Sequence, residues 1–196
     1  MINKILKDYF HIDGDVTIKD GTVSVDGNVK LTKDTPYIPV QFGTVKSFYC
    51  FNKKLTSLVG SPFIVTGDYV CSRNDIKTLI GSPNEIRYDF DFSMNEELTS
   101  LEGSPTKVGG DVNCRGITKI SSFNNLPEQI GGELVVEWSP DVGVLSLIKY
   151  HDVNFLNNHI VRGILKKFYG QKPLRPAIIQ CQKELIDAGF RGNAKL

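Results

Sequence analysis

The sequence has no long apolar run, no strong charge of one sign and no export signal. No stretch of about 18 apolar residues occurs, which is the length that a membrane-spanning helix needs. The formal net charge is +1, so no overall charge directs the chain to nucleic acid or to a membrane surface. The first ten residues lack the unbroken apolar core and small-residue cleavage site of a signal peptide. We therefore expect a cytoplasmic protein that binds neither membrane nor, directly, nucleic acid.

The residues that usually carry catalysis are few and scattered. The three histidines, His11, His151 and His159, have no Ser, Cys or carboxylate partner in a recognisable motif. No phosphate-binding loop occurs, and the four cysteines lack the C-x-x-C spacing of a metal site. We therefore predict a protein that is not an enzyme, with no catalytic residues, no metal site and no cofactor.

What the sequence does contain is a repeat between Val40 and Trp138. Each copy has Leu or Ile, two further residues, a second Leu or Ile, a turn that ends in Pro, and then a short strand. The prolines that close the turns, 21 to 22 residues apart, are Pro62, Pro83, Pro105 and Pro127. A period of this length is typical of a solenoid, in which each coil buries its apolar side chains against its neighbours.

The segments before and after the repeats differ from them in pattern. Residues 2–10 have the apolar spacing of a short helix, and Asp-Gly pairs at 20–21 and 26–27 separate alternating segments, which predicts hairpin turns. Residues 144–148 read as a last apolar strand. Two helices are then expected at about 157–169 and from Pro176 to Gly189.

Together these patterns predict the fold class and its division along the chain. The class is α+β, a leucine-rich-repeat-like β-solenoid with coils of 21 to 22 residues. Residues 1–39 form an N-terminal helix and hairpin cap, 40–138 the solenoid, and 139–196 a C-terminal helical cap. A cap is expected because an end coil otherwise exposes apolar side chains and strand edges. The outer face of the C-terminal helices is an alternative site of recognition.

Strand alternation divides the repeat positions into inward and outward columns. Cys50, Cys71 and Cys114 share an inward column with Phe92 and Val136, so they are predicted to be packing residues. The inward column two residues earlier contains Tyr69, Phe90, Val112 and Leu134. The polar Asn74 and Asn95 are expected to bond the backbone of their own loops.

Three outward columns contain the predicted partner-binding residues, which are all their members except the serines. The first column is acidic except for Ser47. The second contains both apolar and polar residues, and the third begins with Phe51 and is otherwise polar. The first column is Ser47, Asp68, Asp89, Asp111 and Glu133; the second is Tyr49, Val70, Asp91, Asn113 and Val135; the third is Phe51, Ser72, Ser93, Arg115 and Glu137. Stacked acids about 5 Å apart repel one another, which suggests a face that meets a basic surface. The alternative is that Gly-Asp and Gly-Glu merely suit the turn into a strand.

Several motifs resemble one family. The Leu-Thr-Ser-Leu-x-Gly-Ser-Pro units (55–62 and 98–105), the Val-Gly-Gly-Asp-Val-x-Cys stretch (108–114) and the Cys-Ser-x-Asn turn (71–74) are similar to leucine-rich-type repeats of tailed-phage proteins. The segments at 20–29 and 181–190 are similar to those that flank such repeats. The resemblance implies a phage accessory protein in the host cytoplasm. Such proteins often bind host defence proteins, and one is an antitoxin against a toxin that ADP-ribosylates DNA.

These observations lead to an expected function. We expect a monomeric, non-enzymatic protein-protein interaction module, which binds and inhibits a host defence or toxin protein through the exposed strand face. The expected partner is a host protein with a basic surface. The alternatives are a structural or assembly protein of the phage particle, or a small enzyme whose site lies where the solenoid meets residues 139–196.

Overall fold

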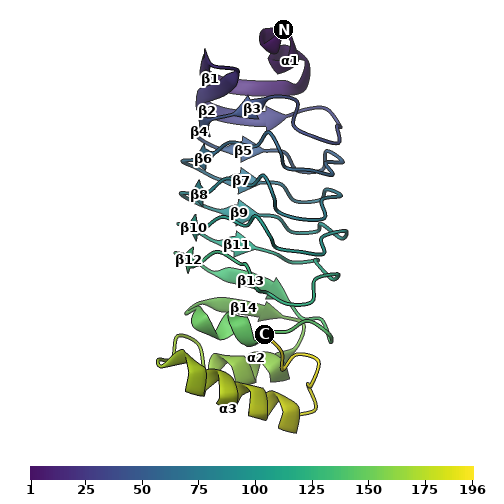
Figure 1. The fold of residues 1–196 in the computed structure, drawn as a ribbon, viewed down its shortest axis with the longest axis vertical. Coiled ribbons are helices and arrows are strands. Elements are labelled where there is room, and N and C mark those ends of the chain that lie inside the picture. Colours follow the sequence, from purple (N-terminus) through teal and green to yellow (C-terminus); the bar gives the residue numbers. More distant parts are fainter.

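The computed structural model describes all 196 residues as one elongated stack of coils (Figure 1). Helix α1 (Ile2–Tyr9) and the long strands β1 (Phe10–Lys19) and β2 (Thr22–Leu31) lie at the N-terminal end. About six coils of about 21 residues follow, and helices close the other end. The predicted α+β solenoid with an N-terminal helix and C-terminal helices is therefore confirmed.

The coils contribute short strands to two sheets. The short strands are β3 (Gln41–Phe42), β4 (Thr44–Val45), β5 (Phe48–Tyr49), β6 (Ile64–Val65), β7 (Tyr69–Val70), β8 (Glu85–Ile86), β9 (Phe90–Asp91), β10 (Lys107–Val108), β11 (Val112–Asn113), β12 (Gln129–Ile130), β13 (Leu134–Glu137) and β14 (Val153–Leu156). One sheet has nine strands, in the order β1, β2, β5, β7, β9, β11, β13, β14, with β3 also beside β2. The other runs β12, β10, β8, β6, β4. All pairs except β1 with β2 are parallel.

The N-terminal hairpin has one turn where the sequence predicted two. Asp20 and Gly21 take positive φ angles of 50° and 78° and form the two-residue turn between β1 and β2. The predicted turn at Asp26-Gly27 is wrong, because both residues lie inside β2. Gly27 pairs with Gly14, and a Cβ at Gly27 would lie 1.6 Å from the Asp13 carbonyl oxygen. This glycine therefore permits a close approach of two strands.

The inward columns are buried as predicted. Tyr69, Phe90, Val112 and Leu134 expose none of their surface, and the same holds for Cys50, Cys71, Phe92, Cys114 and Val136. The Leu or Ile pairs of the repeats, such as Leu55 and Leu58, form the facing wall of the core. Aromatic rings stack from coil to coil, with 6.0 Å between the ring centroids of Phe48 and Tyr69 and 5.7 Å between those of Tyr69 and Phe90. Each coil is thus buried largely by its neighbours.

Two buried asparagines bond coil to coil as well as within their own loops. The side chain of Asn74 accepts hydrogen bonds from the N–H groups of Lys53 (2.8 Å) and Leu55 (3.1 Å) in the preceding coil. It donates to the carbonyls of Cys50 and Cys71, both at 2.9 Å. Asn95 repeats part of this pattern and accepts from the Asn74 N–H at 3.0 Å. The amide side chain replaces backbone partners that the turning chain cannot supply.

The C-terminal region differs from prediction in two elements. Residues 144–148 were expected as a strand, but residues 145–148 belong to a 3-10 helix, η1 (Leu145–Lys149), and Val144 precedes it as the N-cap. Leu147 and Ile148 are adjacent, and both are buried. A helical turn can bury two adjacent side chains, whereas successive side chains of a strand point to opposite faces, of which only one would be buried here. The strand stack also continues past Trp138, because β14 pairs in parallel with β13 and places Val153 opposite Leu134.

Two helices then close the stack below β14 (Figure 1). Helix α2 (His159–Lys166) begins at Asn158, whose side chain accepts hydrogen bonds from the N–H groups of Ile160 and Val161. Helix α3 (Leu174–Asp187) carries Pro176 in its first turn, where proline is tolerated. Each helix turns one apolar face inward, with Val161, Ile164 and Leu165 buried on α2 and Ala177, Cys181 and Leu185 on α3. No helix is long and apolar enough to cross a membrane.

We predict that Asn74→Ala destabilises the fold by about 2 to 4 kcal/mol, because it leaves buried backbone N–H and carbonyl groups without partners. Chemical denaturation measures the loss. The matched control is Asn84→Ala, since Asn84 is exposed and its side chain makes no hydrogen bond. Equal effects of the two substitutions would contradict the structural role of the buried asparagine.

Candidate functional site

The outer face of the nine-stranded sheet carries the residues predicted from the sequence to bind a partner. Strand pairing places Tyr49, Val70, Asp91, Asn113 and Val135 opposite one another in successive coils, and each is half-buried. This is the second outward column of the sequence. Beside it the Phe51 side chain is 38% exposed, and the Lys30 ammonium lies 5.6 Å from its ring centroid. The face therefore has an apolar half towards the N-terminus and a polar half towards the C-terminus.

The acidic column is a hydrogen-bonded ladder. The Oδ1 atom of Asp68 accepts a hydrogen bond from the Asp89 N–H at 3.3 Å, and that of Asp89 accepts from the Asp111 N–H at 2.8 Å. Asp111 Oδ1 accepts from the Glu133 N–H at 2.7 Å. Each aspartate thus binds the backbone of the next coil through one oxygen. The second carboxylate oxygen, Oδ2, has no partner within the protein.

Glycines make room for this ladder. A Cβ at Gly110 would lie 2.1 Å from Asp89 Oδ1, and one at Gly132 would lie 2.1 Å from Asp111 Oδ1. Tyr88 occupies the corresponding position over Asp68, where the hydrogen bond is the longest of the three. The Gly-Asp pair at 110–111 and the Gly-Glu pair at 132–133 therefore have a structural cause, which is the carboxylate of the preceding coil rather than the turn alone.

Three serines expected to face outward are buried instead. The exposed fraction is 5% for Ser47, 8% for Ser72 and 5% for Ser93. Ser47 lies beneath the next coil, where a Cβ at Gly67 would be 2.3 Å from its Oγ. Ser72 and Ser93 lie where the chain leaves the strand, because Arg73 and Met94 take positive φ angles of 57° and 55°. Strand alternation no longer applies there, so that part of the third column was predicted wrongly.

The polar half of the face is hollowed. A depression of about 400 Å³ is lined by predicted site residues, namely Asp89, Asp91, Asp111, Asn113, Arg115 and Val135. The Asn113 side chain accepts from Arg115 Nε at 3.2 Å and so holds that guanidinium. Glu137, the last residue of the third column, instead bonds the Gly116 N–H and the Asn157 side chain. Tyr49, Phe51, Val70 and Asp68 lie in the coils on the N-terminal side of this hollow.

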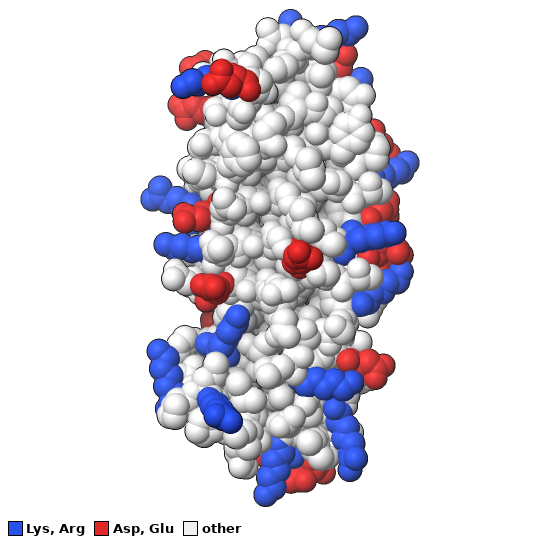
Figure 2. Space-filling model, viewed as in Figure 1, with Lys and Arg blue, Asp and Glu red and all other residues white.

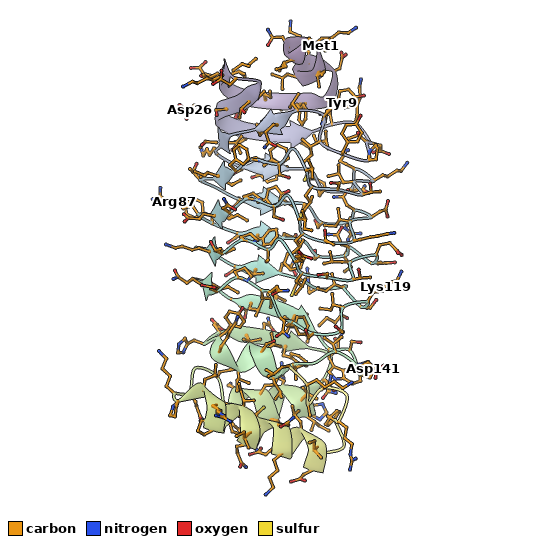
Figure 3. All side chains as sticks on the ribbon, in the orientation of Figure 1. Met1, Tyr9, Asp26, Arg87, Lys119 and Asp141 are labelled. Atoms are coloured by element: carbon orange, nitrogen blue, oxygen red, sulfur yellow. The ribbon has the colours of Figure 1, made fainter.

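No lysine or arginine of the protein pairs with the acidic column. The three ion pairs join Lys54 to Asp34, Lys119 to Glu97 and Lys167 to Glu184. Lys119 projects from the edge of the stack opposite Arg87 (Figure 3). The carboxylates of Asp68, Asp89 and Asp111 are therefore available to cations from outside.

The small net charge hides an uneven distribution along the chain. Residues 139–196 contain nine Lys and Arg against four Asp and Glu, whereas residues 1–138 contain 14 against 18. Figure 2 shows many Lys and Arg side chains over the lower end of the molecule, where α2 and α3 lie, and a largely uncharged middle on that side. The acidic solenoid thus meets a basic helical end.

A second and larger hollow lies at that junction. Its volume is about 610 Å³, and its polar lining includes Glu133, His151, Asp152, His159, Arg162 and Lys166. It adjoins the first hollow, because Asn154 lines both. We call it the junction cleft.

Of the residues that line the junction cleft, only Glu133 is among the partner-binding residues predicted from the sequence. The others come from the start of β14, from α2 and from the turn after it. His151 and His159 flank β14, so recognising that strand from the buried Val153 and Phe155 would have placed both histidines near one edge of the sheet.

The cysteines are buried, as predicted for Cys50, Cys71 and Cys114. All four are free and buried. Burial raises the pKa of the Cys50 and Cys181 thiols to about 12, and it also raises those of Cys71 and Cys114. No three His, Cys, Asp or Glu side chains cluster closely enough to hold a metal ion.

Comparisons with known proteins leave the chain without a matched relative. No family model, curated protein or solved structure matches it. The function is therefore inferred from the face and the cleft themselves.

We predict that Asp89→Ala lowers the free energy of unfolding by about 1 kcal/mol, because the Asp111 N–H loses its acceptor. Asp89→Asn is the matched control and is expected to have little effect, since an amide oxygen also accepts. Chemical denaturation compares the two. A larger loss for the Asn variant than for the Ala variant would contradict the ladder.

A second prediction concerns alkaline pH. Because burial raises the thiol pKa values, the folded state keeps its thiol protons after unfolded thiols, with a reference pKa of 9.0, begin to ionise. The thiol contribution is complete below about pH 9 and is lost as pH rises towards 12, by up to about 1.4 kcal/mol per pH unit for each thiol. Urea unfolding at pH 7.5, 9 and 10.5 measures it, and constant stability over that range would contradict thiol burial.

Proposed function

We propose that this protein is a non-enzymatic binding module that docks a basic surface of a partner protein on the outer face of its nine-stranded sheet. The observation that carries the proposal is the acidic column, in which backbone hydrogen bonds hold Asp68, Asp89 and Asp111 while no cation of the protein neutralises them. A carboxylate has about four acceptor positions. One is used within the ladder, so the rest are left for Lys and Arg donors.

Preorganisation favours recognition by this face. Association loses free energy when side chains must be ordered at the interface, and carboxylates already held by the backbone lose less. Opposite charges across an interface also raise the association rate and help select the partner.

Apolar residues on the same face supply anchors beside the charges. Tyr49, Val70 and Val135 are half-buried members of the central column, and Phe51 lies at its N-terminal end. Aromatic and aliphatic anchors surrounded by polar contacts are the usual composition of an interface. Val135, Asn113 and Arg115 border the hollow and complete the proposed contact surface with Asp91, Glu133 and Glu137.

The repeat motifs support a proposal about origin. Their resemblance to phage leucine-rich-type repeats suggests a phage accessory protein that acts in the host cytoplasm as an inhibitor or antitoxin. The partner is then a host defence or toxin protein, whose basic surface the acidic face covers. The protein binds it as a monomer.

The junction cleft favours a second candidate, a small enzyme. Its volume and polar lining suit a small substrate. A nucleophile and its base, however, normally lie within hydrogen-bond reach of each other. No hydrogen bond joins any two of the titratable cleft residues Glu133, His151, Asp152, His159, Arg162, Lys166 and Tyr169. Binding therefore accounts for the cleft better than catalysis does.

The test of the main proposal neutralises the acidic column without breaking its ladder. A triple variant with Asp68, Asp89 and Asp111 changed to Asn keeps the acceptors but removes three charges. We expect affinity for the captured host partner to fall about tenfold or more and its salt dependence to flatten, because steering by charge is screened by salt. Titrations at two salt concentrations measure both effects.

A matched control removes the same number of charges elsewhere. Glu85, Glu102 and Glu128 are exposed, unpaired and outside the proposed face, so changing them to Gln is expected to leave binding unchanged. Circular dichroism checks that both variants are folded. Equal affinity and equal salt dependence for the Asn triple variant and the wild type would remove the acidic face from the function.

A further inference from the structure

The junction cleft has two walls of opposite charge. Glu133 just before β13 and Asp152 just before β14 form the acidic wall. Arg162 and Lys166 project from α2 four residues apart, and His159 lies three residues before Arg162, so all three share one side of the helix. The cleft thus collects charges of both signs at the place where the acidic solenoid meets the basic end.

These opposite charges do not pair with each other. None of the three ion pairs of the protein crosses the cleft. The neighbouring Lys167 bonds Glu184 on α3 at 2.6 Å, which leaves Arg162 and Lys166 without a carboxylate partner. The Glu133 carboxylate accepts a hydrogen bond only from Asn154 Nδ2, at 3.3 Å. The charged groups of both walls are therefore available to a ligand.

A glycine in the helix keeps the cleft open between the basic side chains. Gly163 lies inside α2, where alanine would stabilise the helix. Its packing does not require glycine, because a Cβ there would meet nothing within 4 Å. Gly163 lines the cleft beside Arg162, so the missing side chain gives a ligand access to the helix surface.

Tyr169 also lines the cleft. Its hydroxyl is shielded from solvent and has no hydrogen-bond partner within the protein. Burial raises the pKa of this phenol against the opposing effect of the Arg162 charge, so the hydroxyl keeps its proton. The N-terminus of α2 is not available to a ligand, because the Asn158 side chain already accepts hydrogen bonds from its first free N–H groups.

We propose that the junction cleft binds a small bipolar ligand. Its oxyanion, a phosphate or a carboxylate, lies against Arg162 and Lys166, and its ammonium group lies against Glu133 and Asp152. A ligand of this kind satisfies both walls at once, which neither an anion nor a cation alone can do. The site does not depend on docking of a partner protein on the strand face.

The test uses two bipolar probes and the separate halves of one of them. Phosphoethanolamine and glycylglycine each join an ammonium to an oxyanion, and inorganic phosphate and ethanolamine each supply charge of one sign only. In NMR titrations we expect saturable shifts of the Gly163 amide and the Tyr169 ring, with at least one bipolar probe binding about tenfold more tightly than either half. Which probe binds more tightly distinguishes a phosphate from a carboxylate ligand.

Variants assign the two ends of the ligand. Arg162→Ala is expected to abolish the shifts, whereas Asp152→Asn weakens the bipolar probe and leaves phosphate alone unchanged. Asp89→Asn, on the strand face, is the control and is expected to bind the probe like the wild type. Equal affinity for phosphate alone and for both bipolar probes would overturn the bipolar assignment, and no shift at about 10 mM probe would overturn the site.

Gly163→Ala separates binding from folding. The substitution is expected to raise the melting temperature, because alanine favours the helix, and to weaken the bipolar probe several-fold by filling the cleft. A more stable variant that binds the probe as well as the wild type would contradict ligand contact with this side of α2.

Discussion

No coil of this protein buries its own core, and the rest of the structure depends on that constraint. A coil of about 21 residues has two-residue strands and an inner row of Leu, Ile or aromatic side chains. Its partners are in the adjacent coils: the Tyr69 N–H donates to the Asp89 carbonyl, and the Phe90 N–H to the Asp111 carbonyl. The hairpin and the helices are needed because the first and last coils would otherwise lack one neighbour.

The same stacking creates the outer face. Backbone N–H groups at the start of each strand bind the aspartate of the preceding coil, and Gly110 and Gly132 leave room for those carboxylates. The acidic column is thus first a structural device and, in the proposed function, a set of fixed acceptors for a basic partner. These roles use different oxygens of each carboxylate, so one does not exclude the other.

The repeat explains which parts of the structure were predictable. A period of 21 to 22 residues identified the inward columns, because Cys71 or Phe90 recurs at a position that stacking must bury. It also identified the central outward column from Tyr49 to Val135. It failed at Ser72 and Ser93, where positive φ angles end the strand, and at Ser47, which the next coil covers.

Outside the repeat, local patterns were weaker guides. Asp26-Gly27 has the sequence of a turn, but its glycine serves a close contact with β1 that depends on distant residues. Strand β14 was missed because it lacks the preceding Pro turn, and residues 145–149 form a helical turn that buries adjacent side chains. The cleft joins residues from 133 to 169 across several elements, so no single motif could reveal it.

Native-state hydrogen exchange tests most directly whether the stack is continuous from the hairpin to the C-terminal helices. We expect slow exchange at cross-coil amides such as Tyr69, Phe90 and Val112, and protection that continues without a break through Leu134 in β13 and Phe155 in β14 into α2. The junction cleft needs that continuity, because residues from 133 to 169 line it. A separate, much less protected unit beginning after Trp138 would contradict it.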